Sequence, residues 1–328
     1  MASGSQLKAL VQSYIDGDDD RFFSVTMQVA AHEARIGHGK LATDLREAID
    51  EAKRRRGAAS LVSISKPRGE LANILEVSNP SNRLSDMIVD PVLANQLQRV
   101  IREQRVAGRI LDHGLSPRRK LLLVGPPGTG KTMTASVLAG ELGLALMQVR
   151  LDGLITRFMG ETAAKLRQVF DATHRTRGIY LFDEFDAIGS GRDLTNDVGE
   201  IRRVLNSFLL MIEQDRSQSL VVAATNHPDI LDRALFRRFD DILHYELPDA
   251  SQATELLRTR LSPHSARVRW RMLGEEAQGL SYAEITRAAN DVLKDALIHD
   301  HGKCHERAIR SMLQERKAIA ARLRDGPQ

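Results

Sequence analysis

The 328-residue sequence contains a single cysteine, Cys304, and only 4% aromatic residues, with one tryptophan. One cysteine excludes an internal disulfide framework and is typical of a protein kept in a reducing compartment. No apolar run approaches membrane-spanning length, and the first residues lack the basic flank and apolar core of a signal sequence. We therefore expect a soluble, cytoplasmic protein with no membrane insertion.

The sequence also lacks a strong charge of either sign and the residue patterns of a protease. Its formal net charge is +4, which is mildly basic and does not by itself indicate a nucleic-acid partner. No Ser/His/Asp arrangement and no His-Glu-x-x-His motif occurs with supporting context. The chain, at 42% hydrophobic residues, is long enough for one large domain or two to three smaller ones.

Apolar spacing divides the chain into four parts. Residues 1–56 contain three amphipathic stretches at helical spacing, which predict a small helical bundle that ends in the basic run 53–56. Residues 57–84 have the glycines and prolines of a linker, with one or two marginal strands. Residues 85–248 alternate strand-like and helical runs, whereas residues 249–328 are helical only.

The alternation predicts an α/β fold, a parallel sheet covered by helices, followed by a small helical lid domain. Such sheets bind ligands at the carboxyl ends of their strands. The expected strands are Lys120–Val124, Ala145–Val149, Ile179–Asp183, Leu220–Ala224 and Ile242–Leu247. The expected helices lie near Val92–Leu111, Met133–Leu142, Glu161–His174 and Glu200–Glu213, and after Pro248 at Gln252–Arg260, Tyr282–His299 and Glu306–Arg324.

A phosphate-binding loop follows the first predicted strand. Residues 125–132 read Gly-Pro-Pro-Gly-Thr-Gly-Lys-Thr, and a helical run comes next. Glycines let backbone N–H groups turn toward phosphates, Lys131 supplies a point charge, and Thr132 offers a hydroxyl ligand for Mg²⁺. The predicted nucleotide-binding residues here are Gly125, Pro126, Pro127, Gly128, Thr129, Gly130, Lys131, Thr132 and Met133. The pattern indicates a P-loop nucleotide triphosphatase that uses Mg²⁺.

Two further strands end in polar residues. Asp183 and Glu184 follow the apolar run 179–182, which suits Asp183 to holding Mg²⁺ and Glu184 to polarising the attacking water. Asn226 follows the run 221–225, and its amide is placed to reach the attacking water or the outermost phosphate if that strand lies beside the first one. A simple turn cap before His227-Pro228 is the alternative for Asn226.

Two adjacent arginines, Arg237 and Arg238, precede the last predicted strand. Presented to the outer phosphate of a neighbouring copy, they would act as arginine fingers that stabilise transition-state charge. The alternative is a surface ion pair with Asp240 or Asp241, which would contribute little.

The order of these motifs resembles the AAA+ ATPases, and more narrowly the AAA group proper, over about residues 84–298. Residues 206–213, 231–240 and 245–249 are most similar to the microtubule-severing and endosomal-disassembly members. The whole chain also resembles small bacterial AAA ATPases that are paired with a subtilisin-like serine protease in plasmid-maintenance and phage-defence gene pairs.

The resemblance implies a ring, a hexamer as in the family, with a polypeptide substrate in its pore. It places Phe158 and Met159 in the first pore loop and Arg192 in the second, although core packing is an alternative for Phe158 and Met159. It places Met87 and Ile88 on the adenine side of the nucleotide, although core packing is an alternative for either, and Ala283 in the segment that closes over the adenine. Tyr282 and Glu284 depart from the glycine and aspartate usual there. The N-terminal bundle takes the position of a substrate- or partner-selecting module.

The function that follows is an ATP-hydrolysing motor that remodels, unfolds or threads a protein, with a subtilisin-like protease as a possible partner. Nucleic acid is the less favoured partner, in a DNA-dependent ATPase whose phosphate contacts are the run 53–56 and the basic C-terminal helix. A third hypothesis is an ATP-gated scaffold that signals to a partner enzyme.

Overall fold

The computed structural model describes residues 13, 19–35, 37–45, 49, 69–154, 159–185, 198–230, 233–265, 268–299 and 301–325. The chain divides into two compact units, Met1–Val62 and Ser63–Gln328. In the first unit, helix α2 spans Asp19–Arg35, and residues 39–45 are also helical. Val29 and Ala30 of α2 are buried, as an amphipathic helix in a bundle requires. The first predicted helix lies outside the described residues, so the three-helix bundle stays a prediction.

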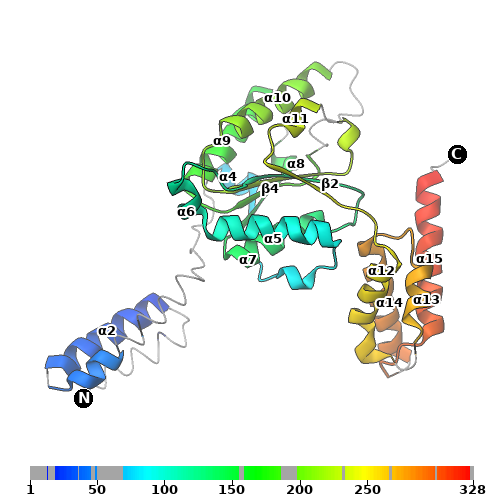
Figure 1. Ribbon diagram of the computed structural model, residues 1–328, viewed down its shortest axis with the longest axis horizontal. Helices are drawn as coiled ribbons and strands as arrows, with labels where there is room; N and C mark the ends of the chain where they lie inside the picture. The colour runs from blue at the N-terminus through cyan, green and yellow to red at the C-terminus, as the bar shows by residue number, and fades with distance from the viewer. Residues whose placement is uncertain are drawn as a thin grey trace. The chain divides into compact units, whose positions relative to one another are not determined.

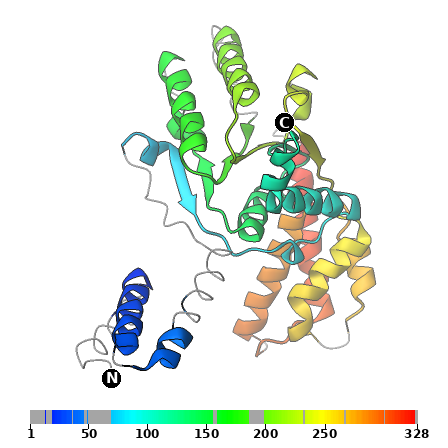
Figure 2. The same cartoon turned by 60° about the vertical axis from the view of Figure 1, so that its left-hand side comes forward.

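The second unit is built on a six-stranded sheet with the order β1-β3-β4-β5-β2-β6. Five strands are parallel, and the edge strand β1 pairs antiparallel with β3 (Figure 2). The predicted α/β fold is confirmed, and the marginal strand expected in the linker is this edge. The strands are β1 (Leu75–Ser78), β2 (Lys120–Val124), β3 (Leu146–Val149), β4 (Ile179–Phe182), β5 (Leu220–Thr225) and β6 (Asp241–His244).

Helices cover both faces of the sheet (Figure 1). Side chains of β2 alternate between the two faces: Leu121 and Leu123 pack with α5 and α7, whereas Leu122 and Val124 belong to the core under α9 and α10. Because both faces are buried, β4 is apolar throughout, and β2 and β5 are apolar except for Lys120 at the start of β2 and Thr225 at the end of β5. The helices and turns of this part are α4 (Leu71–Ile74), η1 (Leu84–Asp86), α5 (Pro91–Arg105), α6 (Ala107–Asp112), α7 (Lys131–Leu142), α8 (Leu151–Leu154), α9 (Met159–Arg175), α10 (Val198–Gln214), η3 (Pro228–Ile230) and α11 (Arg233–Phe236).

The C-terminal helices form a core of their own, as the sequence predicts. They are α12 (Ala250–Leu261), η4 (Ser262–His264), α13 (Trp270–Glu276), α14 (Tyr282–His299) and α15 (Glu306–Asp325). The short α13 has no counterpart in the prediction. Its Gly274 explains how it fits, because a Cβ at this position would overlap Thr254 and the Ala250 carbonyl of α12.

The helix expected over 92–111 is divided into α5 and α6. The backbone leaves helical geometry at Val106, with φ −112° and ψ 22°. Val106 is β-branched, and Gly108 in the next turn has low helix propensity, so this stretch holds a continuous helix poorly. None of the helices in the described ranges is both long and apolar enough to cross a membrane.

Candidate active site

The predicted phosphate loop joins β2 to α7 at the carboxyl edge of the sheet. Gly128 and Gly130 have φ of +74° and +103°, a conformation that residues with a Cβ rarely adopt. Gly130 is the N-cap of α7, so the positive end of that helix lies at the loop. The Thr129 hydroxyl donates to the Pro126 carbonyl at 2.8 Å and closes the turn.

Lys131 is folded into the loop. Its side chain is buried, and Nζ donates to the carbonyl oxygens of Gly125 and Pro126, both at 2.7 Å. A buried ammonium needs such acceptors, and an incoming phosphate oxygen is a stronger acceptor than a carbonyl. The loop therefore holds a positive charge where the outer phosphates of a nucleotide would lie.

Two oxygen ligands meet beside the loop. The Thr132 hydroxyl donates to Asp183 Oδ2 at 2.6 Å, although the two residues are 51 positions apart. In the described part of the chain, no group of three or more His, Cys, Asp or Glu side chains is arranged to hold a metal. Hard cations such as Mg²⁺ bind through one or two protein oxygens together with phosphate oxygens and water, and the Thr132 hydroxyl and the Asp183 carboxylate would supply the protein oxygens.

The sheet order brings the other polar residues to the same edge. β5 lies between β2 and β4, and its register pairs Thr225 with Val124. The expectation that the strand before Asn226 lies beside the first strand is therefore confirmed. Glu184 has a left-handed φ of +50°, and its N–H donates to Asp183 Oδ1 at 3.0 Å. A positive φ is uncommon in residues that have a side chain, and the residues that do adopt it are often found at functional sites.

Of the residues predicted near the adenine, Met87 and Ala283 lie beside the loop and the start of α7. The Thr134 hydroxyl lies 3.9 Å from Met87 Sδ, and Ile88 packs against the C-terminal core. The Ala283 N–H donates to the Gly128 carbonyl at 3.0 Å, which ties the start of α14 directly to the phosphate loop. This approach depends on glycine, because a Cβ on Gly128 would lie 3.0 Å from the Ala283 Cβ.

A cleft of about 450 Å³ adjoins the loop, between α5, the segment after β6, and α14. Thr129, Asp90 and Tyr282 are among its lining residues. Burial, and then the carboxylates of Asp249, Asp90 and Glu255, raise the pKa of Tyr282 to about 12. The tyrosine that replaces the usual glycine is therefore a neutral, partly buried wall of this cleft.

Sequence reasoning missed one pair behind the loop. The Thr134 hydroxyl on α7 shares a 2.5 Å hydrogen bond with the buried hydroxyl of Tyr245, and burial raises the pKa of Tyr245. The two residues are 111 positions apart. No local spacing pattern connects them, so only the packing of β6 beside β2 reveals the contact.

The two arginines lie near the amino ends of the parallel strands, whereas the phosphate loop follows the carboxyl end of β2. The Asp240 carboxylate, just after them, accepts from the Arg119 and Lys120 N–H groups at the amino end of β2, at 2.8 and 2.9 Å. At about 3.3 Å per residue, the length of β2 separates the amino end of this strand from the phosphate loop by roughly 16 Å. Arg237 is exposed, whereas Arg238 Nε pairs with Glu213 at 3.0 Å.

Arg238 therefore does not form the ion pair with Asp240 or Asp241 that was the alternative to an arginine finger. Asp240 is occupied by the β2 backbone, and Asp241 lies 3.4 Å from Arg118. Phe158, Arg192 and the basic run 53–56 lie outside the described residues. Met159 begins α9, but its side chain is likewise outside the description.

Comparison with known proteins finds similarity to ATPases. The family model for "ATPase family associated with various cellular activities (AAA)" matches residues 121–247. The chain is 33% identical to the uncharacterized AAA family ATPase y4kL of Sinorhizobium fredii over 331 residues, which cover 98% of this chain and 99% of that protein.

More distant relatives match only one portion of the chain. Protein SAV of Sulfolobus acidocaldarius is 32% identical over 60% of this chain and 26% of its own length. The ATP-dependent zinc metalloprotease FtsH 1 of Thermoanaerobacter sp. is 32% identical over 60% of this chain and 34% of its own length. This chain thus spans about a third or less of these larger relatives.

Proposed function

Since this chain belongs to the AAA family of ATPases and hydrolyses ATP, we propose that it works as a ring-forming motor, a hexamer, that remodels or threads a polypeptide. AAA ATPases commonly assemble as rings. The observation that carries the proposal is the separation of Arg237 and Arg238 from the phosphate loop by roughly the length of β2. Each active centre then needs the arginines of a second copy.

Within one copy, the loop and the strand ends take separate roles. Lys131 exchanges its carbonyl partners for the outer phosphates, and Thr132 and Asp183 hold Mg²⁺. When bound, Mg²⁺ neutralises phosphate charge. Glu184 orients and polarises the attacking water, and Asn226 contacts that water or the outermost phosphate.

The bond between Ala283 and Gly128 supports coupling of hydrolysis to movement. Because α14 begins at this bond, a change in the loop on loss of the outermost phosphate is passed to the C-terminal helices. Met87, which lies beside Thr134 of α7, and Ile88 enclose the adenine together with Ala283. The C-terminal helices thus act as the lid of the site.

The substrate is proposed to be a polypeptide gripped in the ring pore by Phe158, Met159 and Arg192. An aromatic side chain contacts extended polypeptides with little sequence preference, because most of its contact is apolar. The bundle within residues 1–56 selects the substrate or a partner, for which a subtilisin-like protease in a defence system is our proposal. The cytoplasm is the proposed compartment.

Self-association is the first test. ATP turnover per chain is expected to rise steeply with protein concentration, because dilution separates the two halves of each site. A dilute, strictly monomeric protein with full turnover would contradict the shared site.

Threading is tested separately with Phe158→Ala and the control Phe158→Tyr, which keeps an aromatic ring. The alanine variant should lose substrate-stimulated turnover, and the tyrosine variant should retain most of it. Unchanged stimulation in the alanine variant would contradict threading. Stimulation by DNA that weakens steeply with added salt would favour the DNA-dependent alternative instead.

Affinity capture identifies the substrate. Glu184→Gln removes the group that polarises water but leaves the phosphate contacts, so this variant should retain ATP and the bound polypeptide. If the variant turns over ATP at the normal rate, the role assigned to Glu184 is wrong.

A further inference from the structure

The two adjacent arginines before β6 have different surroundings. Arg238 Nε donates to Glu213 Oε2 at 3.0 Å, and its side chain is 31% exposed. Arg237 is exposed and, among the residues that the structure describes, has no hydrogen bond or ion pair. One arginine is therefore engaged within its own chain, and the other is available to another molecule.

Buried residues on both sides fix the turn that carries these arginines. Leu235 is fully buried and Phe239 is 8% exposed, and both belong to the core under α9 and α10. The Arg238 N–H donates to the Leu235 carbonyl at 3.0 Å, which closes the turn. Since Leu235 and Phe239 hold the chain from either side, Arg237 projects from a rigid turn.

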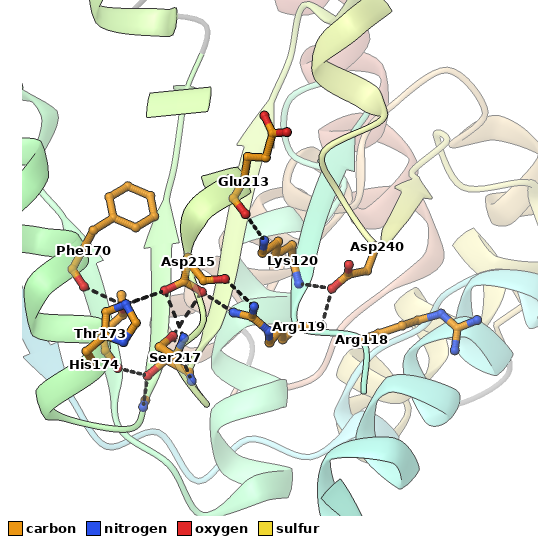
Figure 3. A network of polar contacts seen from close by, with 12 residues as sticks. Arg118, Arg119, Lys120, Phe170, Thr173, His174, Glu213, Asp215, Ser217 and Asp240 are labelled. Carbon is orange, nitrogen blue, oxygen red and sulfur yellow. Dashed lines mark hydrogen bonds and ion pairs between the residues drawn. The ribbon is translucent and has the colours of Figure 1, made fainter. Parts of the chain in front are cut away.

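The far end of the turn is bound to β2. One oxygen of the Asp240 carboxylate accepts both the Arg119 and the Lys120 backbone N–H groups, at 2.8 and 2.9 Å (Figure 3). Hydrogen bonds to an ionised carboxylate are stronger than bonds between neutral groups. The turn therefore cannot shift along the sheet without losing two of them.

The end of α10 is held by the same two residues, Arg119 and Lys120, where β2 begins. The Arg119 guanidinium donates to the fully buried carboxylate of Asp215, and Lys120 Nζ donates to the Glu213 carbonyl at 3.4 Å. In Figure 3 the Glu213 carboxylate points away from Asp215, and the Glu213 side chain is 60% exposed. The Glu213 backbone is thus held beside β2, and Arg238 is the residue of the turn that pairs with the Glu213 carboxylate.

We infer that Arg237 alone is the cation presented to the neighbouring copy's nucleotide, and that Arg238 is a positioning residue that acts through Glu213. This inference rests on the proposed function, because it assumes that a neighbour's arginine completes each site. The Arg238–Glu213 pair joins the turn to α10, and together with the Asp240 bonds it sets the direction in which Arg237 projects.

Charge exchange separates this role from direct phosphate contact. Arg238→Glu and Glu213→Arg should each lower kcat for ATP about 5- to 10-fold with KM within about twofold, because positioning acts in the transition state. The double variant Glu213→Arg with Arg238→Glu restores the pair with reversed charges and should return kcat to within about twofold of the parent. Arg237→Ala should lower kcat at least about 100-fold, since trans arginines contribute 10³–10⁵ in other NTPases.

A matched control uses the exposed pair Arg271–Glu275 on α13, whose side chains are 91% and 55% exposed. Exchanging its charges should leave kcat unchanged. Thermal unfolding midpoints should be similar for all variants, because exposed ion pairs contribute little to stability.

Mixing experiments test the shared active site separately from the role of Arg238. Lys131→Ala and Arg237→Ala are each inactive, but mixed rings contain sites with an intact loop and an intact neighbouring Arg237, so activity should reappear. If activity does not reappear, the proposal that two copies share each active site is wrong. If activity does reappear, and the double exchange variant stays as inactive as Arg237→Ala, then Arg238 contacts phosphate directly and this inference is overturned.

Discussion

Loss of the Asp215 carboxylate should destabilise the second unit of the chain strongly. Its side chain has no exposed surface, and it accepts hydrogen bonds from the Arg119 guanidinium and from the hydroxyls of Thr173 and Ser217, the latter two at 3.1 and 3.2 Å. Arg119 is only 15% exposed. Asp215→Ala would therefore leave a largely buried guanidinium without its carboxylate and the Ser217 hydroxyl without its acceptor, whereas the Thr173 hydroxyl keeps the Phe170 carbonyl at 2.7 Å.

The magnitude follows from this burial. Removing one partner of a buried ion pair costs about 3–5 kcal/mol, because the remaining charge stays desolvated without compensation. For a unit of this size, each kcal/mol lowers the unfolding midpoint by about 2–4 °C, so a decrease of roughly 6–20 °C is expected. Asp215→Asn keeps acceptors for the hydroxyls and should lose only the charge-assisted part, about 1.5–3 kcal/mol.

Thermal unfolding followed by circular dichroism, without nucleotide, measures the effect directly. Nucleotide is omitted because a ligand of the native state raises the midpoint. Glu275→Ala is the matched control: it removes a carboxylate from the exposed α13 pair with Arg271, which contributes no more than about 0.5 kcal/mol. Equal midpoint changes in Asp215→Ala and Glu275→Ala would refute the reasoning.

Three further outcomes are expected. Gly128→Ala places a Cβ 2.7 Å from a hydroxyl oxygen of the segment before α14, at a φ of +74°. The resulting strain of about 1–3 kcal/mol should raise KM for ATP roughly 5- to 150-fold. The control Gly108→Ala has open space around the new Cβ and should leave KM unchanged. Tyr245→Phe removes the buried hydroxyl that bonds a threonine of α7 at 2.5 Å and should lower the free energy of unfolding by about 1 kcal/mol in urea titration, whereas an unchanged value would mean that the bond adds nothing. The hydrogen bond from Arg269 lowers the pKa of Glu306 from its usual 4.5 to about 2, so its stabilising effect is complete above pH 4.5 and is lost as pH falls toward 2. Arg269→Ala should accordingly reduce the change of the urea midpoint between those pH values, and an unaltered pH profile would contradict that assignment.

Local sequence patterns predicted much of the fold. The bounds of β2 and α14 agree with the expected ranges Lys120–Val124 and Tyr282–His299. Both are signalled by their own residues: β2 is a short apolar run between polar residues and glycine, and α14 has apolar residues at helical spacing. The break at Val106 and the short α13 were missed, because a change of direction within one or two turns leaves little periodicity to detect.

The phosphate loop was predictable for the same reason. Its glycines and the residues of Lys131 and Thr132 lie within eight consecutive positions, so spacing alone identifies the chemistry. The Asp-Glu pair after β4 was found because a buried strand seldom ends in two carboxylates beside such a loop. The motifs assign Thr132 and Asp183 each to Mg²⁺, but their direct contact across 51 positions depends on how β2 and β4 lie in the sheet.

By itself, then, the sequence determined the elements, the loop chemistry and the family, because each depends on residues that are neighbours in the chain. Tertiary structure decided the antiparallel edge strand, the bond between Ala283 and Gly128, and the different surroundings of Arg237 and Arg238. These features join segments that lie far apart in the chain: Glu213 and Arg238 are 25 positions apart, and Gly128 and Ala283 are 155 positions apart. Their pairing depends on the order of strands in the sheet and on which helices cover each face, and no local pattern of residues encodes either.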